Sequence, residues 1–194
     1  MKGVLLIGSA RLFLAVALAG AQGGLTGENL LVEIPSGYEL GHHQKADQGE
    51  ISEFIPKGET VEGWSEMITV QLLPAHNSNA KFYATFESLA KQACTDGSTE
   101  VIATTEENGY PVKVFILSCP TNQQTNMGET TFIKTIEGKD KFYVVQKAWR
   151  TEKYEPDQLP LTSDDVTHWT QYLRSVYVCD SRVKERNCPT VVSP

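Results

Sequence analysis

Two turns that contain glycine, each between two strand-like runs, constrain the fold of this chain more than any other feature. Residues 100–119 place Asn108-Gly109 between two runs rich in β-branched residues, and an Asn-Gly pair favours the left-handed backbone of a tight hairpin turn. Residues 129–150 place a second turn, Gly138-Lys139-Asp140, between two runs in which apolar side chains recur at every second position. Two such hairpins predict an antiparallel sheet.

The second strand of the later hairpin carries apolar side chains on both of its faces. One face is apolar except for Gln146, and the other is apolar except for Lys147. The apolar members are Phe142, Val144 and Ala148 on the first face and Tyr143, Val145 and Trp149 on the second. A strand that is apolar on both faces is typical of a central position in a sheet with a helix on each side.

Residues 54–71, FIPKGETVEGWSEMITVQ, allow two interpretations: a binding loop around Trp64, or two strands and the corner between them. The Pro-Lys-Gly sequence is a turn signal. Beyond it, Ile68, Val70 and Leu72 share the parity of Trp64, which is the period of a half-buried strand. We therefore interpret the segment as strand, turn and strand. Shorter strand-like runs precede it at residues 29–35, 38–44 and 49–56.

Two segments change to the period of a helix. In residues 77–97, an apolar stripe lies between possible N-caps at Asn77, Ser78 and Asn79 and a terminating glycine. In residues 162–179, a second stripe follows a possible cap at Thr162 or Ser163. The stripes consist of Phe82, Phe86, Leu89 and Ala93 in the first segment and Val166, Trp169, Leu173 and Val176 in the second. The elements together predict an α+β fold, with a central, mainly antiparallel β-sheet flanked by two principal helices.

Residues 1–21 have the order of a secretory signal peptide: the charges of Lys2 and Arg11, an apolar run, and small residues that end at Ala21. The apolar run is about half the ~20 residues that span a bilayer, so a retained membrane anchor is the weaker interpretation. We expect cleavage near Ala21. Residues 22–194 would then be one exported domain with a disulfide-pinned C-terminal tail, either periplasmic or fully secreted.

The charge of the chain limits its partners. The formal net charge is −7, and it becomes −9 when cleavage removes Lys2 and Arg11. An acidic chain without a basic cluster is repelled by phosphate backbones and by anionic membrane surfaces. We therefore expect no nucleic acid as the main partner and no stable membrane anchor.

Four cysteines remain after cleavage, and an even number in an exported chain predicts two disulfides. Of the three possible pairings, we expect Cys94 with Cys119 and Cys179 with Cys188, because each pair lies close in sequence across one structural junction. A zinc site is the alternative. It is disfavoured because no Cys-x-x-Cys pair occurs and His168 is the only histidine near these cysteines in sequence.

Several segments together carry a resemblance to a known family. They are residues 54–71, the helix that ends in Cys94, SCPTN at 118–122, TIEGKDKFYVVQKAWR at 135–150 and YVCD at 177–180. Through them, nearly all of the chain after residue 21 resembles a family of small exported proteobacterial proteins to which no activity is assigned. The resemblance implies an architecture similar to the α/β/α sandwich named after Mog1 and PsbP. It supplies no catalytic residues, and it favours binding over catalysis by analogy alone.

The sequence contains none of the common catalytic or cofactor motifs. All four cysteines can pair, and neither a Gly-x-Ser-x-Gly elbow nor a glycine-rich phosphate loop occurs. His42, His43, Asp47 and Glu50 are the one conceivable metal cluster. Neighbouring residues of a strand point to opposite faces, so a solvated edge is the better interpretation. We therefore expect no cofactor and no metal, and no catalytic residue can be assigned.

Two tryptophans with polar neighbours suggest a shallow groove for a ligand or partner, because aromatic and arginine side chains are frequent anchors of interfaces. The candidate binding set is Trp64, Glu66, Gln71, Gln146, Trp149 and Arg150. The simpler interpretation, which we favour, places Trp64 in the core at the strand corner and Trp149 beneath the final helix. Large aromatic side chains are mostly buried.

The leading hypothesis is a soluble exported protein that acts by binding or assembly rather than by catalysis, with an unknown envelope protein or a small ligand as its partner. A small secreted hydrolase is the alternative. Its sign would be a deep pocket with two or more ionisable groups within hydrogen-bond reach of each other. A chaperone is a third hypothesis, and its sign would be an exposed apolar patch of several hundred Å2.

Overall fold

The computed structural model describes residues 25–189, so the expected signal peptide at residues 1–21 lies outside the described part of the chain. Within residues 25–189, no helix is both long enough and apolar enough to cross a membrane. That residues 22–194 form a single domain stays a prediction.

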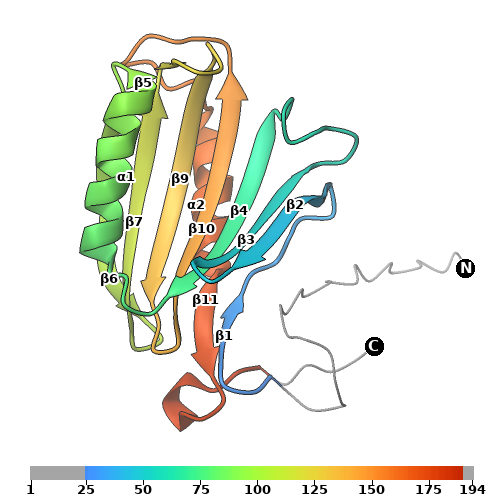
Figure 1. The fold of residues 1–194 in the computed structure, drawn as a ribbon, viewed down its shortest axis with the longest axis vertical. Coiled ribbons are helices and arrows are strands. Elements are labelled where there is room, and N and C mark those ends of the chain that lie inside the picture. Colours follow the sequence, from blue (N-terminus) through green and yellow to red (C-terminus); the bar gives the residue numbers. More distant parts are fainter. Residues whose placement is uncertain (1–24, 190–194) are drawn as a thin grey trace, which may run out of the picture.

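The centre of the fold is a seven-stranded sheet in which every neighbouring pair is antiparallel (Figure 1). Its strands, in spatial order, are β2 (Tyr38–Ala46), β3 (Gly49–Pro56), β4 (Glu66–Pro74), β10 (Lys141–Thr151), β9 (Gly128–Glu137), β7 (Tyr110–Cys119) and β6 (Ser98–Glu107). Both predicted hairpins are present, as β6–β7 and β9–β10. Asn108 and Gly109 have the positive φ angles that an Asn-Gly turn requires. The predicted antiparallel sheet is confirmed.

Both predicted helices form, and each begins at a capping residue. Helix α1 (Asn79–Ala93) follows Ser78, whose side chain accepts a hydrogen bond from a backbone amide of the first turn. Helix α2 (Ser163–Ser175) follows Thr162, which shares a reciprocal capping box with Asp165. The caps satisfy backbone donors that a helix start leaves unpaired.

The prediction that the second helix continues to Cys179 is wrong. Helix α2 ends before Val176, and Tyr177–Asp180 form strand β11, which pairs antiparallel with β1 (Glu28–Leu31). Val176 and Val178 are β-branched and favour extended backbone. In residues 177–180, hydrogen bonds to β1 replace the hydrogen bonds that a longer helix would have made within itself. Pairing with a distant strand therefore decides where the helix ends.

The two helices lie on opposite faces of the sheet, with α1 in front of the strands and α2 behind them in Figure 1. On β10, Phe142 and Val144 pack in the cluster that includes α1, whereas Tyr143 and Val145 belong to the cluster that includes α2. We call the two sides the α1 face and the α2 face. This alternation explains why β10 is apolar at both parities.

Helix α1 covers only part of its face. It packs on β6, β7 and β9, and its Phe82 ring reaches Phe142 of β10 at a centroid distance of 5.5 Å. No helix of residues 25–189 covers the region that continues across β10, β4, β3 and β2 (Figure 1). We call this region the open half of the α1 face, defined by Ile51, Glu53, Thr69, Gln71, Leu73 and Gln146.

Both expected disulfides are present. Cys94 is bonded to Cys119 and Cys179 to Cys188. The first ties the end of α1 to the end of β7, beside two short paired strands, β5 (Cys94–Thr95) and β8 (Thr121–Asn122). The second ties β11 to the segment after the short helix η1 (Lys184–Arg186).

Candidate functional site

The structure divides the six candidate binding residues between the two faces of the sheet. Strands β4 and β10 pair with Trp149 opposite Glu66 and with Gln146 opposite Thr69. Since side chains alternate along a strand, Glu66 and Trp149 lie on the α2 face, while Gln71 and Gln146 lie on the α1 face. The six residues therefore do not line one groove.

The α2 face holds a fully buried lysine. Lys147 has no exposed side-chain surface, and its Nζ donates hydrogen bonds to Glu66 Oε2 at 2.5 Å and to the Tyr38 hydroxyl at 2.7 Å. The Tyr38 hydroxyl in turn donates to Glu66. The same Nζ lies 4.2 Å from the ring centroid of Trp169 and 4.9 Å from that of Trp149. We call Lys147, Glu66, Tyr38, Trp149 and Trp169 the lysine cage.

Burial shifts the ionisation of the lysine cage. Desolvation lowers the pKa of Lys147 to about 8, although the Glu66 carboxylate favours the charged amine. Burial alone would raise the pKa of Glu66, but the hydrogen bonds from Lys147 and Tyr38 lower it on balance. Burial, and then the neighbouring Glu66, raise the pKa of Tyr38. The result is an ion pair between a fully buried amine and a partly exposed carboxylate, in which the amine gives up its proton more readily than a lysine in water.

A second buried lysine lies under the same helix. Lys134 Nζ donates to the carbonyl oxygens of Leu173 at 2.9 Å and Val176 at 2.7 Å, and it pairs with Glu107 at 2.5 Å. It therefore neutralises the carbonyl-rich end of α2, where the helix dipole favours a cation. Our sequence interpretation gave neither lysine a role. The available signal in the sequence was a lysine among the alternate residues of a central strand that are otherwise apolar.

The open half of the α1 face has the opposite character. One row of residues crosses the sheet in register, from Phe115 and Ile133, which are buried beneath α1, to Gln146, Thr69 and Glu53. The row changes from apolar to polar where helix α1 stops covering the strands. The central strands place all three polar side chains; Thr69 is buried, whereas Gln146 and Glu53 are half-buried.

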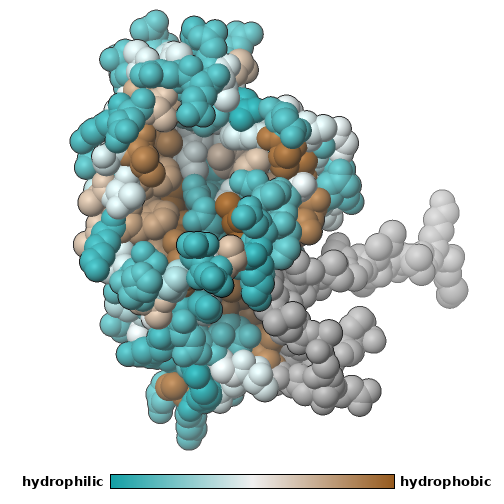
Figure 2. All heavy atoms as spheres, in the orientation of Figure 1, coloured by the Kyte–Doolittle hydropathy of each residue, from teal (hydrophilic) through white to brown (hydrophobic). Residues whose placement is uncertain are grey.

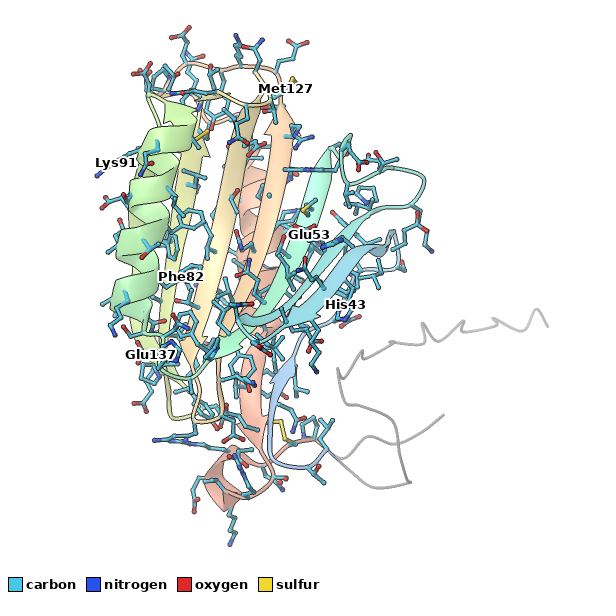
Figure 3. The ribbon with its side chains drawn as sticks, viewed as in Figure 1. His43, Glu53, Phe82, Lys91, Met127 and Glu137 are labelled. Carbon is cyan, nitrogen blue, oxygen red and sulfur yellow. A yellow bond between two sulfur atoms is a disulfide. The ribbon has the colours of Figure 1, made fainter. Side chains whose placement is uncertain are left out.

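The polar side chains of the open half have unused hydrogen-bonding capacity. Glu53, Gln71 and Gln146 are half-buried, and none of them makes a side-chain hydrogen bond or ion pair with another residue in the range 25–189. Figure 3 labels Glu53 on β3 and Phe82 on α1, with β10 between them. A carboxylate and two amides on rigid strands can therefore accept and donate hydrogen bonds to a ligand.

Apolar side chains border the open half at a shallow pocket of about 270 Å3, which is lined by Ile51, Gln71 and Leu73, together with residues of the β2–β3 turn. Leu89 was predicted to lie on the stripe by which α1 packs on the sheet, but it is 59% exposed and does not belong to the cluster between α1 and the strands. Figure 2 shows the surface hollowed between two hydrophobic areas on this face.

Both tryptophans of the candidate set belong to the scaffold, as the simpler interpretation expects. Trp64 is 9% exposed and packs with Ile55 and Met67. The Arg150 guanidinium stacks 4.0 Å from the Trp64 ring centroid and donates to the Glu62 carbonyl oxygen at 2.9 Å. Trp149 is buried on the α2 face, with its ring centroid 5.9 Å from that of Trp169.

The two histidines near the sheet edge are exposed and separated by the strand. His42 pairs with Glu53 and His43 with Ser52, so their side chains lie on opposite faces. Among residues 25–189, no group of three or more His, Cys, Asp or Glu side chains is placed to hold a metal ion.

A larger pocket, of about 640 Å3, lies between β5, β8 and the loop before α2. Its ionisable lining residues are Asp96, Lys153, Tyr154 and Glu155. No described hydrogen bond or ion pair joins any two of these four groups. The sign that would favour a hydrolase, a pair of coupled ionisable groups in a pocket, is not found among these residues.

Comparisons with known proteins give a family and a fold neighbour. The model of a protein family matches residues 36–177. A comparison with curated proteins found no match. Among solved structures, the chain is similar to the 1.9 Å crystal structure of the Saccharomyces cerevisiae Ran-binding protein Mog1p. The sequence identity is 14%, the TM-score is 0.47, and the alignment covers 89% of this chain and 98% of that chain.

Proposed function

We propose that this chain, which belongs to the family whose model matches residues 36–177, is a non-enzymatic binding or assembly module of the cell envelope. Its signal peptide at residues 1–21 would be removed on export, and its recognition surface would be the open half of the α1 face. The observation that carries the proposal is a set of half-buried polar side chains without partners, held on central strands that no described helix covers.

The contrast with the lysine cage supports this proposal. On the α2 face, Lys147 and Glu66 satisfy each other, which is the normal condition of buried polar groups in a folded protein. On the α1 face, Gln71, Gln146 and Glu53 are left to solvent or to a ligand. The strands already fix the backbone of these residues, so a ligand that binds them has to order side chains but no loop.

The lysine cage does not serve catalysis in this proposal. A lysine with a pKa of about 8 has the ionisation of a catalytic base, but Lys147 has no exposed side-chain surface. A substrate therefore has no route to its Nζ in this conformation. We assign the cage to holding Trp169, and with it α2, on the sheet. One helix on each face also fits the Mog1/PsbP-like sandwich, which stays part of the proposal.

The test is site-specific crosslinking in the envelope of cells that export the full chain. Gln71 and Gln146 are each replaced by p-benzoylphenylalanine, and Thr167, an exposed residue of α2, is replaced in the control. The products are separated under non-reducing conditions and identified by mass spectrometry. One shared product from positions 71 and 146 that is absent from position 167 is expected. Monomer alone from both positions, with both disulfides intact, would contradict the proposal.

A further inference from the structure

Strand β6 is an edge of the central sheet with an unpaired side. It contains ten residues and pairs only with β7 among residues 25–189. In an antiparallel pair, the backbone N–H and C=O groups of every second residue point away from the partner strand. No described backbone or side-chain hydrogen bond reaches those outward groups of β6. The edge is therefore able to pair with another strand.

Exposed apolar side chains gather at this edge. Of the five large apolar side chains that are exposed within residues 25–189, three are Val101 and Ile102 of β6 and Leu159 of the loop before α2. Leu159 also lines a pocket of about 220 Å3, together with Ile116 of β7 and Ser98 and Glu100 of β6. This pocket lies over β6 and β7, next to the outermost strand, within reach of a long side chain from a strand added to β6.

The opposite edge of the sheet, β2, is protected in a way that β6 is not. Strand β2 carries Lys45, and a lysine on an edge strand discourages strand addition. Residues 98–107 of β6 contain no lysine, arginine, histidine or proline. Both β2 and β6 contain a β-bulge or similar irregularity in their register, so this feature does not explain why one edge would be protected and the other open.

The charge beside β6 selects the kind of partner. Glu100 and Glu106 of β6 and Asp157 of the adjacent loop are exposed carboxylates. Lys113 is the nearest described cation on the neighbouring strand, and its Nζ donates to Thr104 Oγ1 of β6 at 3.2 Å. An acidic edge attracts a basic segment and repels a second copy of this acidic chain.

We propose that β6 binds an extended, basic segment of a partner protein by strand addition. The segment pairs its backbone with the outer side of β6 and places one apolar side chain in the pocket beneath Ile116 and Leu159. Its basic side chains lie on the opposite face of the added strand, near Glu106, which the β6–β7 register places on the face away from the pocket. This surface is separate from the open half of the α1 face, so the two proposals can fail independently.

The test uses a phage-displayed library of random linear nine-residue peptides, selected on the full exported chain. Selected peptides are synthesised, and the exchange of backbone amide hydrogens is compared with and without peptide. Two variants are matched: Ile102→Lys on β6 and Leu40→Lys on β2, both at exposed apolar positions of an edge strand. Melting temperatures of both variants that equal that of the unsubstituted chain show that neither is misfolded.

We expect enriched peptides that alternate apolar and basic residues and that slow amide exchange in residues 98–107. Ile102→Lys should weaken binding roughly tenfold, because a lysine on an edge strand opposes pairing, and Leu40→Lys should not. Methylating every second peptide amide should abolish binding in one register and not in the other, since only one set of amides meets β6. The proposal is overturned if no peptide is enriched, or if the protected residues are those of β2 or of the open half.

Discussion

The two faces of strands β4 and β10 are built from neighbouring residues and have opposite properties. On the α2 face, Lys147 is enclosed by aromatic rings and its charge is matched by Glu66. On the α1 face, Gln146, the residue before it, has no described side-chain partner. The alternation of side chains along a strand therefore separates positions that stabilise the fold from positions that are free to recognise a ligand.

The largest expected difference is between Lys147 and Gln146. Lys147→Ala should lower the free energy of unfolding by about 2–5 kcal/mol, mainly because it opens a cavity beneath Trp169, with a smaller cost from the partly exposed Glu66 carboxylate that loses its cation. Gln146→Ala should change it by less than about 0.5 kcal/mol, as is usual at a site without buried partners. Urea unfolding of both variants measures the difference, and similar losses would show that parity does not separate the two roles.

A paired replacement separates charge from packing in the lysine cage. Lys147→Met keeps most of the side-chain volume, so its cost is mainly the uncompensated Glu66 carboxylate. Adding Glu66→Gln to Lys147→Met should recover part of the lost stability, because it removes that charge. If the double variant is as unstable as Lys147→Ala, the cage depends on the volume and hydrogen bonds of Lys147 rather than on its charge.

The disulfides test how firmly each face is held. Cys94 and Cys119 enclose 25 residues and Cys179 and Cys188 enclose 9, so the chain-entropy estimate gives about 3.5 and about 2.5 kcal/mol of stabilisation. Replacing each pair with alanine should therefore destabilise the α1 side more than the β11 side. Thermal unfolding of the two double variants gives the order, and a reversed order would show that local packing of the tail outweighs loop length.

The buried lysines predict that stability rises above pH 8. The folded pKa of Lys147 is about 8 and that of a lysine in the unfolded chain about 10.5, so between these values the unfolded chain binds more protons. The contribution of Lys147 to the free energy of unfolding should rise by about 2 kcal/mol from pH 8 to pH 10. Burial also lowers the pKa of Lys134, which adds in the same direction.

Above about pH 10 the trend should reverse. Burial raises the pKa values of Tyr38, Tyr143 and Tyr172, so these phenols stay protonated in the folded chain while the unfolded chain releases their protons. Urea unfolding between pH 7 and pH 11 under non-reducing conditions measures both limbs. Lys147→Met should remove most of the increase in unfolding free energy between pH 8 and pH 10 and should keep the decrease above pH 10. A rise of equal size in that variant would exclude Lys147 as its source.

The sequence predicted the elements whose signals are local. The Asn108-Gly109 turn, the cap at Ser78 and the two apolar stripes each depend on residues within a few positions of one another. These parts of the fold are confirmed, except that Leu89 of the first stripe is exposed. The cysteine pairing could be predicted from the sequence for the same reason, because each disulfide joins neighbouring elements.

The sequence did not reveal the features that depend on distant pairing. Residues 66–74 pair with residues 141–149, and only this register places Glu66 beside Lys147 and Gln71 on the opposite face. The end of α2 was missed because β11 finds its partner in β1, near the other end of the described chain. A set of candidate residues chosen by proximity in sequence therefore mixed two faces that the sheet keeps apart.

The smallest expected effect on stability, and the most direct test of function, belongs to the open half. Glu53→Gln and Gln71→Ala should each change the free energy of unfolding by less than about 0.5 kcal/mol, because neither side chain has a described partner to lose. If the open half recognises a partner, Gln71→Ala should nevertheless reduce the crosslink formed at position 146. Glu53→Gln should reduce it as well when the partner presents a cation. Thr167→Ala on α2 is the control. Unchanged crosslinking in both variants would leave the polar row as a solvated surface, and the contrast between the two faces would then describe stability alone.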